Sequence, residues 1–408
     1  MLTEKQLENY CELVLSVGVN IQKGQELLIN SPIECAYMAR KLTKKAYDLG
    51  AKFVRVNYMD EQINKLNFEN ATAETLCYTP KWFIDSKMDM VKNNACYITI
   101  DAEDPELLQN VDKDKLMKYS IARGKAFKKF SSAVMKNDIR WCVVSVPTEV
   151  WAKKVLPNSN NPIDELWDMI ASTMRLDSEN PVSAWKEHID TLNRRAKYLN
   201  DKNFEYLRFE NAKGTDLKVG LAIGHKWIAA EEVGKDGVKF IANMPTEEIF
   251  TAPHYKKVDG VLKSALPLVS EGNVIDEFTL YFKDGRIYDY TAEKGYDALK
   301  NLIEADNGSH YIGEVALLGK NSPIANTGAL FFNTLFDENA SCHLAIGKAY
   351  PTTVNGGDKM SVKELKEHGL NDSIVHADFM IGTKDLKVTG ITFDGKEEVF
   401  FDDGEWLI

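Results

Sequence analysis

Two residues near the C-terminal end of the sequence, His376 and Asp378, have side chains that bind divalent metals and a spacing that suits a common site. Imidazole nitrogens and carboxylate oxygens are common ligands of divalent first-row cations. Because side chains two residues apart in an extended strand leave the same face, this pair can converge on one ion or on two neighbouring ions. The alternative is a histidine that donates to a backbone carbonyl, next to an aspartate that begins a turn.

Glu314 is a second candidate, because it interrupts an apolar run, Ile-Gly-Glu-Val-Ala-Leu, that predicts a buried strand. A buried carboxylate without a partner is costly, so we expect a cation beside it. That cation is either a metal ion or a lysine in a buried salt bridge. His343 precedes another apolar run, Leu-Ala-Ile, which makes it either a metal ligand or a core histidine with satisfied ring nitrogens.

Three more acidic residues are candidates with alternative roles. Glu338, shortly before His343, is a ligand, an acceptor that fixes the imidazole tautomer, or a solvated turn residue. Glu247 and Glu248 are adjacent, so their side chains point in different directions. We expect at most one of these two to face the site and the other to face solvent.

The motifs of several other enzyme classes are absent from the sequence. It contains neither the His-Glu-x-x-His helix of mononuclear zinc proteases nor the Gly-x-Ser-x-Gly elbow of serine hydrolases. It also lacks a Walker-type phosphate loop. The candidate acids and histidines are far apart in the sequence, so only a folded site would unite them.

The composition limits the class of protein and its partners. A chain of 408 residues that is 44% hydrophobic and 27% charged is globular material for two or three domains. The formal net charge of -11 argues against a nucleic-acid partner and against an anionic membrane surface. The six cysteines are scattered singly, which predicts a reducing compartment without a disulfide framework. With no secretory leader and no run of about 20 apolar residues, we expect a cytoplasmic protein.

The elements that must position the candidate residues fall into two regions. Residues 1–200 alternate helical patterns with apolar runs and predict an N-terminal α/β region of one or two subdomains with parallel strands; the runs are at 27–29, 52–58, 95–100 and 141–146. Residues 201–408 contain alternating runs separated by Asp-Gly turns, with the clearest hairpin at 278–290. They predict a mixed, largely antiparallel α/β domain that carries the site. The polar run at 200–203 marks the expected boundary.

At these residues the sequence resembles the aminopeptidase T and aminopeptidase S family of dinuclear metallo-aminopeptidases, and the resemblance covers essentially the whole chain. Residues 243–253, Asn-Met-Pro-Thr-Glu-Glu-Ile-Phe-Thr-Ala-Pro, are similar to the family's first ligand segment, and Gly-Glu at 313–314 is similar to its second. Residues 337–343, Asp-Glu-Asn-Ala-Ser-Cys-His, resemble a third segment, and His-Ala-Asp at 376–378 resembles the last ligand pair. Carried over residue by residue, the resemblance implies the metal ligands Glu248, Glu314, Glu338, His343, His376 and Asp378, and the active-site tyrosine Tyr350.

The resemblance implies a homodimer that uses two divalent cations, zinc, cobalt, manganese or magnesium, to release N-terminal amino acids from short peptides. Two cations about 3.5 to 4 Å apart can activate water and bind the scissile carbonyl, while Tyr350 donates to the developing oxyanion. Core packing is the alternative role for Tyr350. Two other functions stay open: a metal-dependent amidohydrolase or dipeptidase that acts on other small amides, and a non-catalytic protein with a structural metal.

Overall fold

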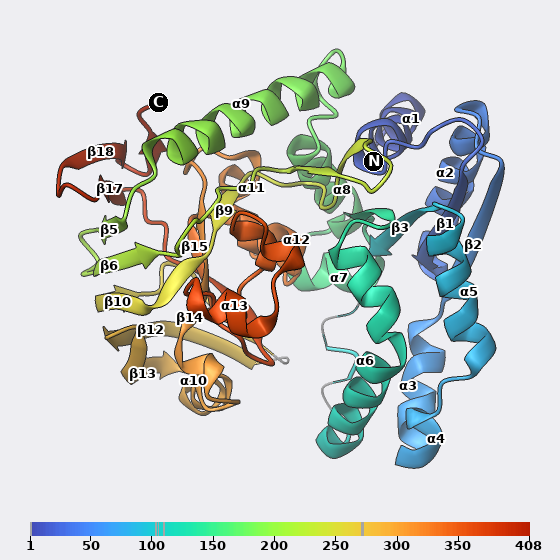
Figure 1. The fold of residues 1–408 in the computed structure, drawn as a ribbon. Coiled ribbons are helices and arrows are strands. Elements are labelled where there is room, and N and C mark those ends of the chain that lie inside the picture. Colours follow the sequence, from blue (N-terminus) through green and yellow to red (C-terminus); the bar gives the residue numbers. More distant parts are fainter. Residues whose placement is uncertain (1, 103, 105, 109–110, 271–272) are drawn as a thin grey trace. The chain divides into compact units, whose positions relative to one another are not determined.

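The computed structural model describes residues 2–102, 104, 106–108, 111–270 and 273–408. The chain forms two compact units, the first from 1–187 with 231–245 and the second from 188–230 with 246–408. Figure 1 labels their helices and strands. The first unit contains a parallel sheet between helices and the second is mostly antiparallel sheet, so the fold is the mixed α/β class that the sequence predicts.

The first unit is built on a four-stranded parallel sheet with the strand order β2-β1-β3-β4, as the alternating apolar runs and helical patterns predict. Its strands are β1 (Glu26–Pro32), β2 (Phe53–Met59), β3 (Cys96–Asp101) and β4 (Arg140–Ser145). Its helices are α1 (Glu4–Leu13), α2 (Ala36–Asp48), α3 (Glu61–Asn70), α4 (Ala73–Cys77), α5 (Lys81–Lys92), α6 (Lys113–Met135), α7 (Glu149–Val155) and α8 (Pro162–Thr173). Like every other helix of the described residues, these are too short or too polar to cross a membrane.

Two features place the division between the units elsewhere than at the expected boundary, 200–203. Helix α9 (Pro181–Lys202) continues through most of that polar run, because polar residues suit the exposed side of a helix as well as a loop. Residues 231–245 belong to the first unit, where β7 (Glu231–Val233) pairs with β8 (Lys239–Ile241). Just after β8, Val143 of β4 donates its backbone N–H to Ala242 and accepts that of Met244. The chain therefore leaves the second unit and returns to it.

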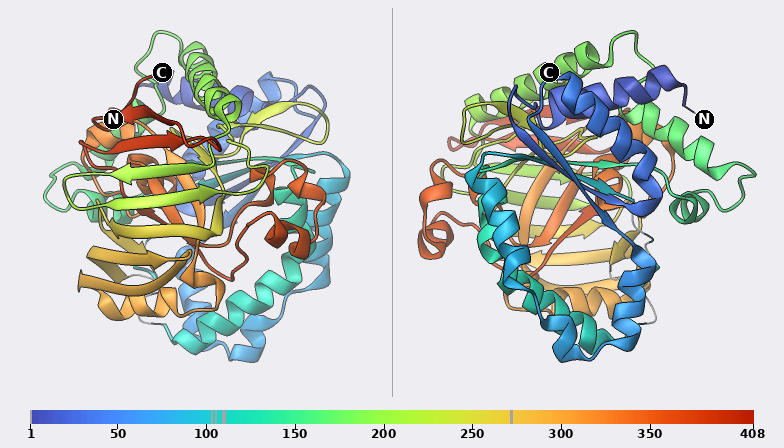
Figure 2. Two further views of the ribbon diagram at one scale, coloured as in Figure 1. Left: turned by 60° about the vertical axis from the view of Figure 1, so that its left-hand side comes forward. Right: turned by 90° about the vertical axis from the view of Figure 1, so that its right-hand side faces the viewer.

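The larger sheet of the second unit has nine strands in antiparallel pairs, with the order β11-β12-β10-β6-β5-β17-β18-β19 and with β13 beside β12. Several of these strands are seen side by side in Figure 2. The hairpin of β12 and β13 confirms the one predicted at 278–290. The strands are β5 (Tyr206–Glu210), β6 (Asp216–Leu221), β10 (Pro253–Lys263), β11 (Leu268–Ser270), β12 (Asn273–Lys283), β13 (Arg286–Lys294), β17 (Lys387–Ile391), β18 (Glu397–Asp402) and β19 (Glu405–Trp406).

A second, four-stranded antiparallel sheet in this unit has the order β16-β15-β14-β9. Its strands are β9 (Ile249–Thr251), β14 (Ile312–Leu317), β15 (His343–Gly347) and β16 (His376–Met380). Four short helices connect the strands of the unit: α10 (Tyr296–Ile303), α11 (Pro323–Thr327), α12 (Thr334–Asp337) and α13 (Val362–Glu367). All four strands of this sheet adjoin or contain residues that the sequence identifies as candidate ligands.

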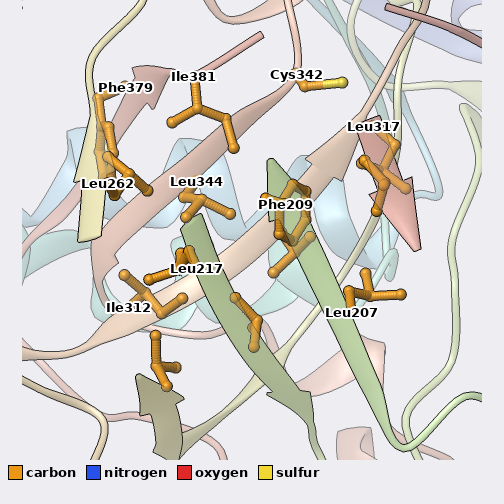
Figure 3. Close-up of a cluster of buried hydrophobic side chains, with 14 of the residues drawn as sticks. Leu207, Phe209, Leu217, Leu262, Ile312, Leu317, Cys342, Leu344, Phe379 and Ile381 are labelled. Carbon is orange, nitrogen blue, oxygen red and sulfur yellow. The ribbon is translucent and has the colours of Figure 1, made fainter. Parts of the chain in front are cut away.

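The two sheets of the second unit share one hydrophobic core (Figure 3). Leu344 and Phe379 from the smaller sheet lie in the same buried cluster as Phe209, Leu217 and Leu262 from the larger sheet. Fully burying a side chain of this kind contributes about 1.5 to 3 kcal/mol. One face of the smaller sheet therefore packs into this core, and its other face can carry polar side chains.

Candidate metal centre

The second face of the four-stranded sheet carries most of the candidate ligands. Directly opposed residues of an antiparallel pair point to the same face, and the register sets Ala345 opposite both Glu314 and Asp378. His343 lies two residues before Ala345, and His376 lies two before Asp378, so these side chains share that face. The sheet therefore separates the candidate ligands from the hydrophobic core.

A one-residue bulge in β14 puts Glu314 on the ligand face. The register of the β14–β15 ladder shifts by one residue between the positions before and after Gly313. In an unbroken ladder Glu314 would point into the core, because a one-residue shift moves a side chain to the other face. Glycine suits this position, since a Cβ atom on Gly313 would lie 2.4 Å from the carbonyl oxygens of Gly347 and Lys348.

The candidate ligands form two groups that share Glu314. Its Oε1 lies 3.8 Å from Nε2 of His343, and that nitrogen lies 3.0 Å from Oε2 of Glu248. Its Oε2 lies 3.7 Å from Nε2 of His376, and that nitrogen lies 3.4 Å from Oδ1 of Asp378. Within each group the ligand atoms are all within 4.8 Å of one another. The two oxygens of Glu314 thus face two different imidazoles.

Backbone carbonyls orient both imidazole rings. Nδ1 of His343 lies 3.2 Å from the carbonyl oxygen of Ser341, and Nδ1 of His376 lies 2.7 Å from that of Lys348. A carbonyl oxygen only accepts, so Nδ1 carries the proton in each ring. When a ring is neutral, its Nε2 lone pair therefore points toward the carboxylates, which is the orientation that a metal-binding histidine needs.

The pKa values of this cluster reflect crowded charges in a buried place. Burial raises the pKa of Glu314 to about 7, and the carboxylates of Asp378 and Glu248 add to this effect. Burial alone would lower the pKa of His376, but Asp378 and Glu314 outweigh it and raise that pKa to about 9. For Asp378 itself, burial raises the pKa, but the hydrogen bond and charge of the adjacent His376 outweigh burial and lower the pKa below its ordinary value. Positive charge beside these buried carboxylates would therefore stabilise their ionised forms.

The residues present fit divalent cations. Oε2 of Glu248 and Oδ1 of Asp378 are buried without a well-aligned hydrogen bond among the described residues, and an imidazole Nε2 lies 3.0 Å from the first oxygen and 3.4 Å from the second. A buried carboxylate oxygen in this condition is costly unless a cation compensates it. The donor set consists of carboxylate oxygens and imidazole nitrogens without a thiolate, which suits hard to borderline divalent ions.

Glu338 and Tyr350 lie beside the two groups and belong to neither. Burial, followed by the charge of Glu248, raises the pKa of Glu338 well above its ordinary value, so these carboxylates are close neighbours. The ring of Tyr350 contacts that of His376 edge to face, with 4.9 Å between the centroids. Burial and then nearby carboxylates raise the pKa of Tyr350, so its hydroxyl keeps its proton at neutral pH. The structure thus brings all seven residues named by the sequence into one neighbourhood.

The expectation that one of the adjacent acids, Glu247 and Glu248, faces solvent is wrong. Glu247 is 6% exposed, and its Oε2 lies 3.6 Å from Nε2 of His188 on α9. The same nitrogen lies 2.8 Å from the carbonyl oxygen of Thr246. The sequence carries no local sign of this contact, because His188 lies in a charged helical stretch that is far from Glu247 along the chain.

Comparison with known proteins shows similarity along nearly the whole chain. Residues 3–406 match the family described as thermophilic metalloprotease (M29). Aminopeptidase 2 of Geobacillus stearothermophilus is 43% identical over 405 residues, which cover 99% of this chain and 98% of that protein. Aminopeptidase T of Thermus thermophilus is 35% identical over 407 residues, which cover 99% of each. The solved structure of wild-type AmpT from Thermus thermophilus matches with a TM-score of 0.93 at 34% identity, covering 99% of this chain and 100% of that one.

Proposed function

This chain belongs to the thermophilic metalloprotease (M29) family, and we propose that this metal-dependent aminopeptidase uses two divalent cations bound at the cluster around Glu314. The observation that carries the proposal is the division of the two Glu314 oxygens between two imidazoles. A carboxylate with one oxygen in each of two ligand groups is suited to bridge two ions. A single ion would leave one group of buried, crowded acids without compensation.

The proposed ligand sets follow the two groups of side chains. Glu248, His343 and Glu314 would hold the first ion, and His376, Asp378 and Glu314 would hold the second. We propose Glu338 as a sixth ligand, because it is a close neighbour of these acids. Zinc, cobalt, manganese and magnesium all accept oxygen ligands, and the two imidazoles favour zinc or cobalt.

When bound, two such cations lower the pKa of water and polarise a peptide carbonyl. The remaining steps belong to the side chains. The carbonyls of Ser341 and Lys348 keep His343 and His376 oriented, so the site needs little rearrangement during the reaction. Tyr350 donates a hydrogen bond to the carbonyl oxygen as negative charge develops there. A preorganised donor in this role lowers the activation free energy by about 2.7 to 4 kcal/mol.

The proposed substrates are short peptides with a free α-amino group. A protonated amine gains charge-assisted hydrogen bonds from carboxylates near the metal ions, and an acetylated amine cannot make them. We also propose that the enzyme is a cytoplasmic homodimer. All six cysteines are free thiols, which is compatible with a reducing compartment, and the resemblance to aminopeptidases T and S supports a dimer.

Two experiments test the proposal. Metal-free protein is titrated with zinc or cobalt while bound metal and the rate on an aminoacyl amide are measured together. We expect the rate to rise fully only with the second equivalent per chain, and full activity with one equivalent would refute the two-cation site.

The second experiment compares one short peptide in its free, N-acetylated and C-amidated forms by time-resolved mass spectrometry. We expect stepwise loss from the N-terminus of the free and amidated forms and no cleavage of the acetylated form. Efficient cleavage of the acetylated peptide would instead support an amidohydrolase with a broader choice of substrates.

A further inference from the structure

The side chain of Asn339 connects two chain segments that each carry a proposed metal ligand. Its Oδ1 accepts the backbone N–H of Glu247 at 2.8 Å, across 92 residues of sequence. Its Nδ2 donates to the carbonyl oxygen of Leu335 at 3.2 Å and to Oε1 of Glu338 at 3.5 Å. Asn339 is fully buried, so water does not compete for these bonds.

Only an amide can make this set of contacts without adding charge. Its oxygen serves as the acceptor for Glu247 N–H, and its NH₂ group serves as the donor to Glu338 and Leu335. An aspartate in its place would put a third charge beside two carboxylates. A leucine of similar size would leave the buried N–H of Glu247 without its acceptor, which costs about 1 to 3 kcal/mol.

His188 holds the same segment from α9. Its Nε2 lies 2.8 Å from the carbonyl oxygen of Thr246, immediately before the N–H that Asn339 binds. On the other side of Glu248, the backbone of Phe250 exchanges two hydrogen bonds with Ile228, each 2.9 Å long. The main chain around Glu248 is therefore fixed at points on both sides of it.

We propose that Asn339 is a positioning residue that sets Glu248 and Glu338 relative to each other, and that His188 supports it by holding the backbone before Glu248. The proposal rests on the proposed metal centre, because the expected effect of these two side chains is a higher affinity for the metal. Replacing a residue that orients a metal ligand through a hydrogen bond typically lowers the metal affinity about 10- to 100-fold. A side chain that touches two ligand-bearing segments should have an effect of this size without touching the ions.

The test is the zinc affinity of folded protein, measured by competition with a chromophoric chelator. Asn339→Leu removes both kinds of hydrogen bond without changing the net charge. Asn200→Leu is the matched control, because Asn200 accepts from and donates to the backbone of Trp227 in the same unit, and neither of these hydrogen bonds involves a proposed ligand. We expect zinc affinity to fall about 10- to 100-fold in Asn339→Leu and to stay at the parent value in Asn200→Leu. Equal affinities in these two variants and the parent would overturn the proposal.

A second pair of variants decides the matter if Asn339→Leu does not fold. His188→Leu removes the donor to Thr246, whereas the amide of His188→Gln can replace it. We expect weaker zinc binding in His188→Leu and recovery in His188→Gln, and parent affinity in both would refute a positioning role for this segment. A parent protein that binds one zinc ion would contradict the two-cation site, while the affinity of that ion would still test Asn339.

Discussion

Replacing Glu314 by glutamine should change the stability of the second unit in opposite directions in the absence and in the presence of metal. Without metal, Glu314 is a buried carboxyl whose pKa is raised from its ordinary value of 4.5 to about 7. Glutamine has nearly the same shape and resembles the protonated carboxyl. The substitution therefore removes the cost of burying the charge and also removes the side chain that we propose as a ligand of both cations.

The size of the first effect follows from the pKa of Glu314. The folded state binds the proton more tightly than the unfolded state, so the folded state loses stability as the pH rises. The loss is negligible below about pH 4, grows between 4.5 and about 7, and is complete above that value. The difference of about 2.5 pH units corresponds to about 3 kcal/mol.

We expect metal-free Glu314→Gln to be more stable than the parent by about 3 kcal/mol at pH 8 and equal to it at pH 4. Saturating zinc should reverse the order at pH 8. Metal that binds only the folded state stabilises the parent by about 2.7 kcal/mol at 100 times the dissociation constant, and the variant binds it poorly.

The assay is urea unfolding read by pulsed hydrogen exchange on peptides from β14 and β15, which follows the second unit separately from the first. Glu293→Gln on β13 is the control, because Glu293 is exposed in the same unit. A metal-free Glu314→Gln protein that is less stable than the parent at pH 8 would refute the reasoning. So would a difference that does not change between pH 4 and pH 8.

Four further outcomes are expected. Tyr350→Phe should bind as much metal as the parent and retain substrate binding while kcat falls about 100- to 1000-fold; normal turnover would assign Tyr350 to packing. Exhaustive chelation should abolish activity, and several divalent ions should restore it to different degrees, as rate assays after metal reconstitution would show. Gly313→Ala places a Cβ atom 2.4 Å from two backbone oxygens, so β14 and β15 must separate and zinc affinity should fall even where circular dichroism shows a folded protein. Leu344→Ala, at a fully buried core position, should lower the free energy of unfolding of the second unit by about 2 to 5 kcal/mol, measured by the same pulsed exchange.

The parts of the site that depend on local periodicity could be predicted from the sequence. His376 and Asp378 lie two apart in what is indeed a strand, and their side chains are 3.4 Å apart. The parallel sheet of the first unit and the hairpin of β12 and β13 also follow from local patterns. In each of these cases the side chains that decide the structure are close together in the sequence.

The rest depends on contacts between distant segments. Glu248 meets His343 only because β9, β14 and β15 pair in that order, and single-strand patterns do not specify the order of pairing. Glu247 is buried beside His188 of α9, and the sequence of α9 has no local feature that indicates this contact. The same limitation applies to residues 231–245, which return to the first unit by pairing beside β4.

Glu314 is an intermediate case. The sequence does indicate which face of β14 its side chain occupies, but the simple alternation of a strand predicts the wrong face. Strict alternation in β14 would put Glu314 on the same face as Ile312, yet Ile312, Val315 and Leu317 all lie in the hydrophobic core. These positions can share a face only if one extra residue is inserted between Ile312 and Val315. Gly313 is the residue that allows it, since glycine within a strand often marks a bulge or a close backbone approach. A glycine directly before an acid in an apolar strand is therefore a physical reason to expect that the acid has been turned out of the core and toward a site.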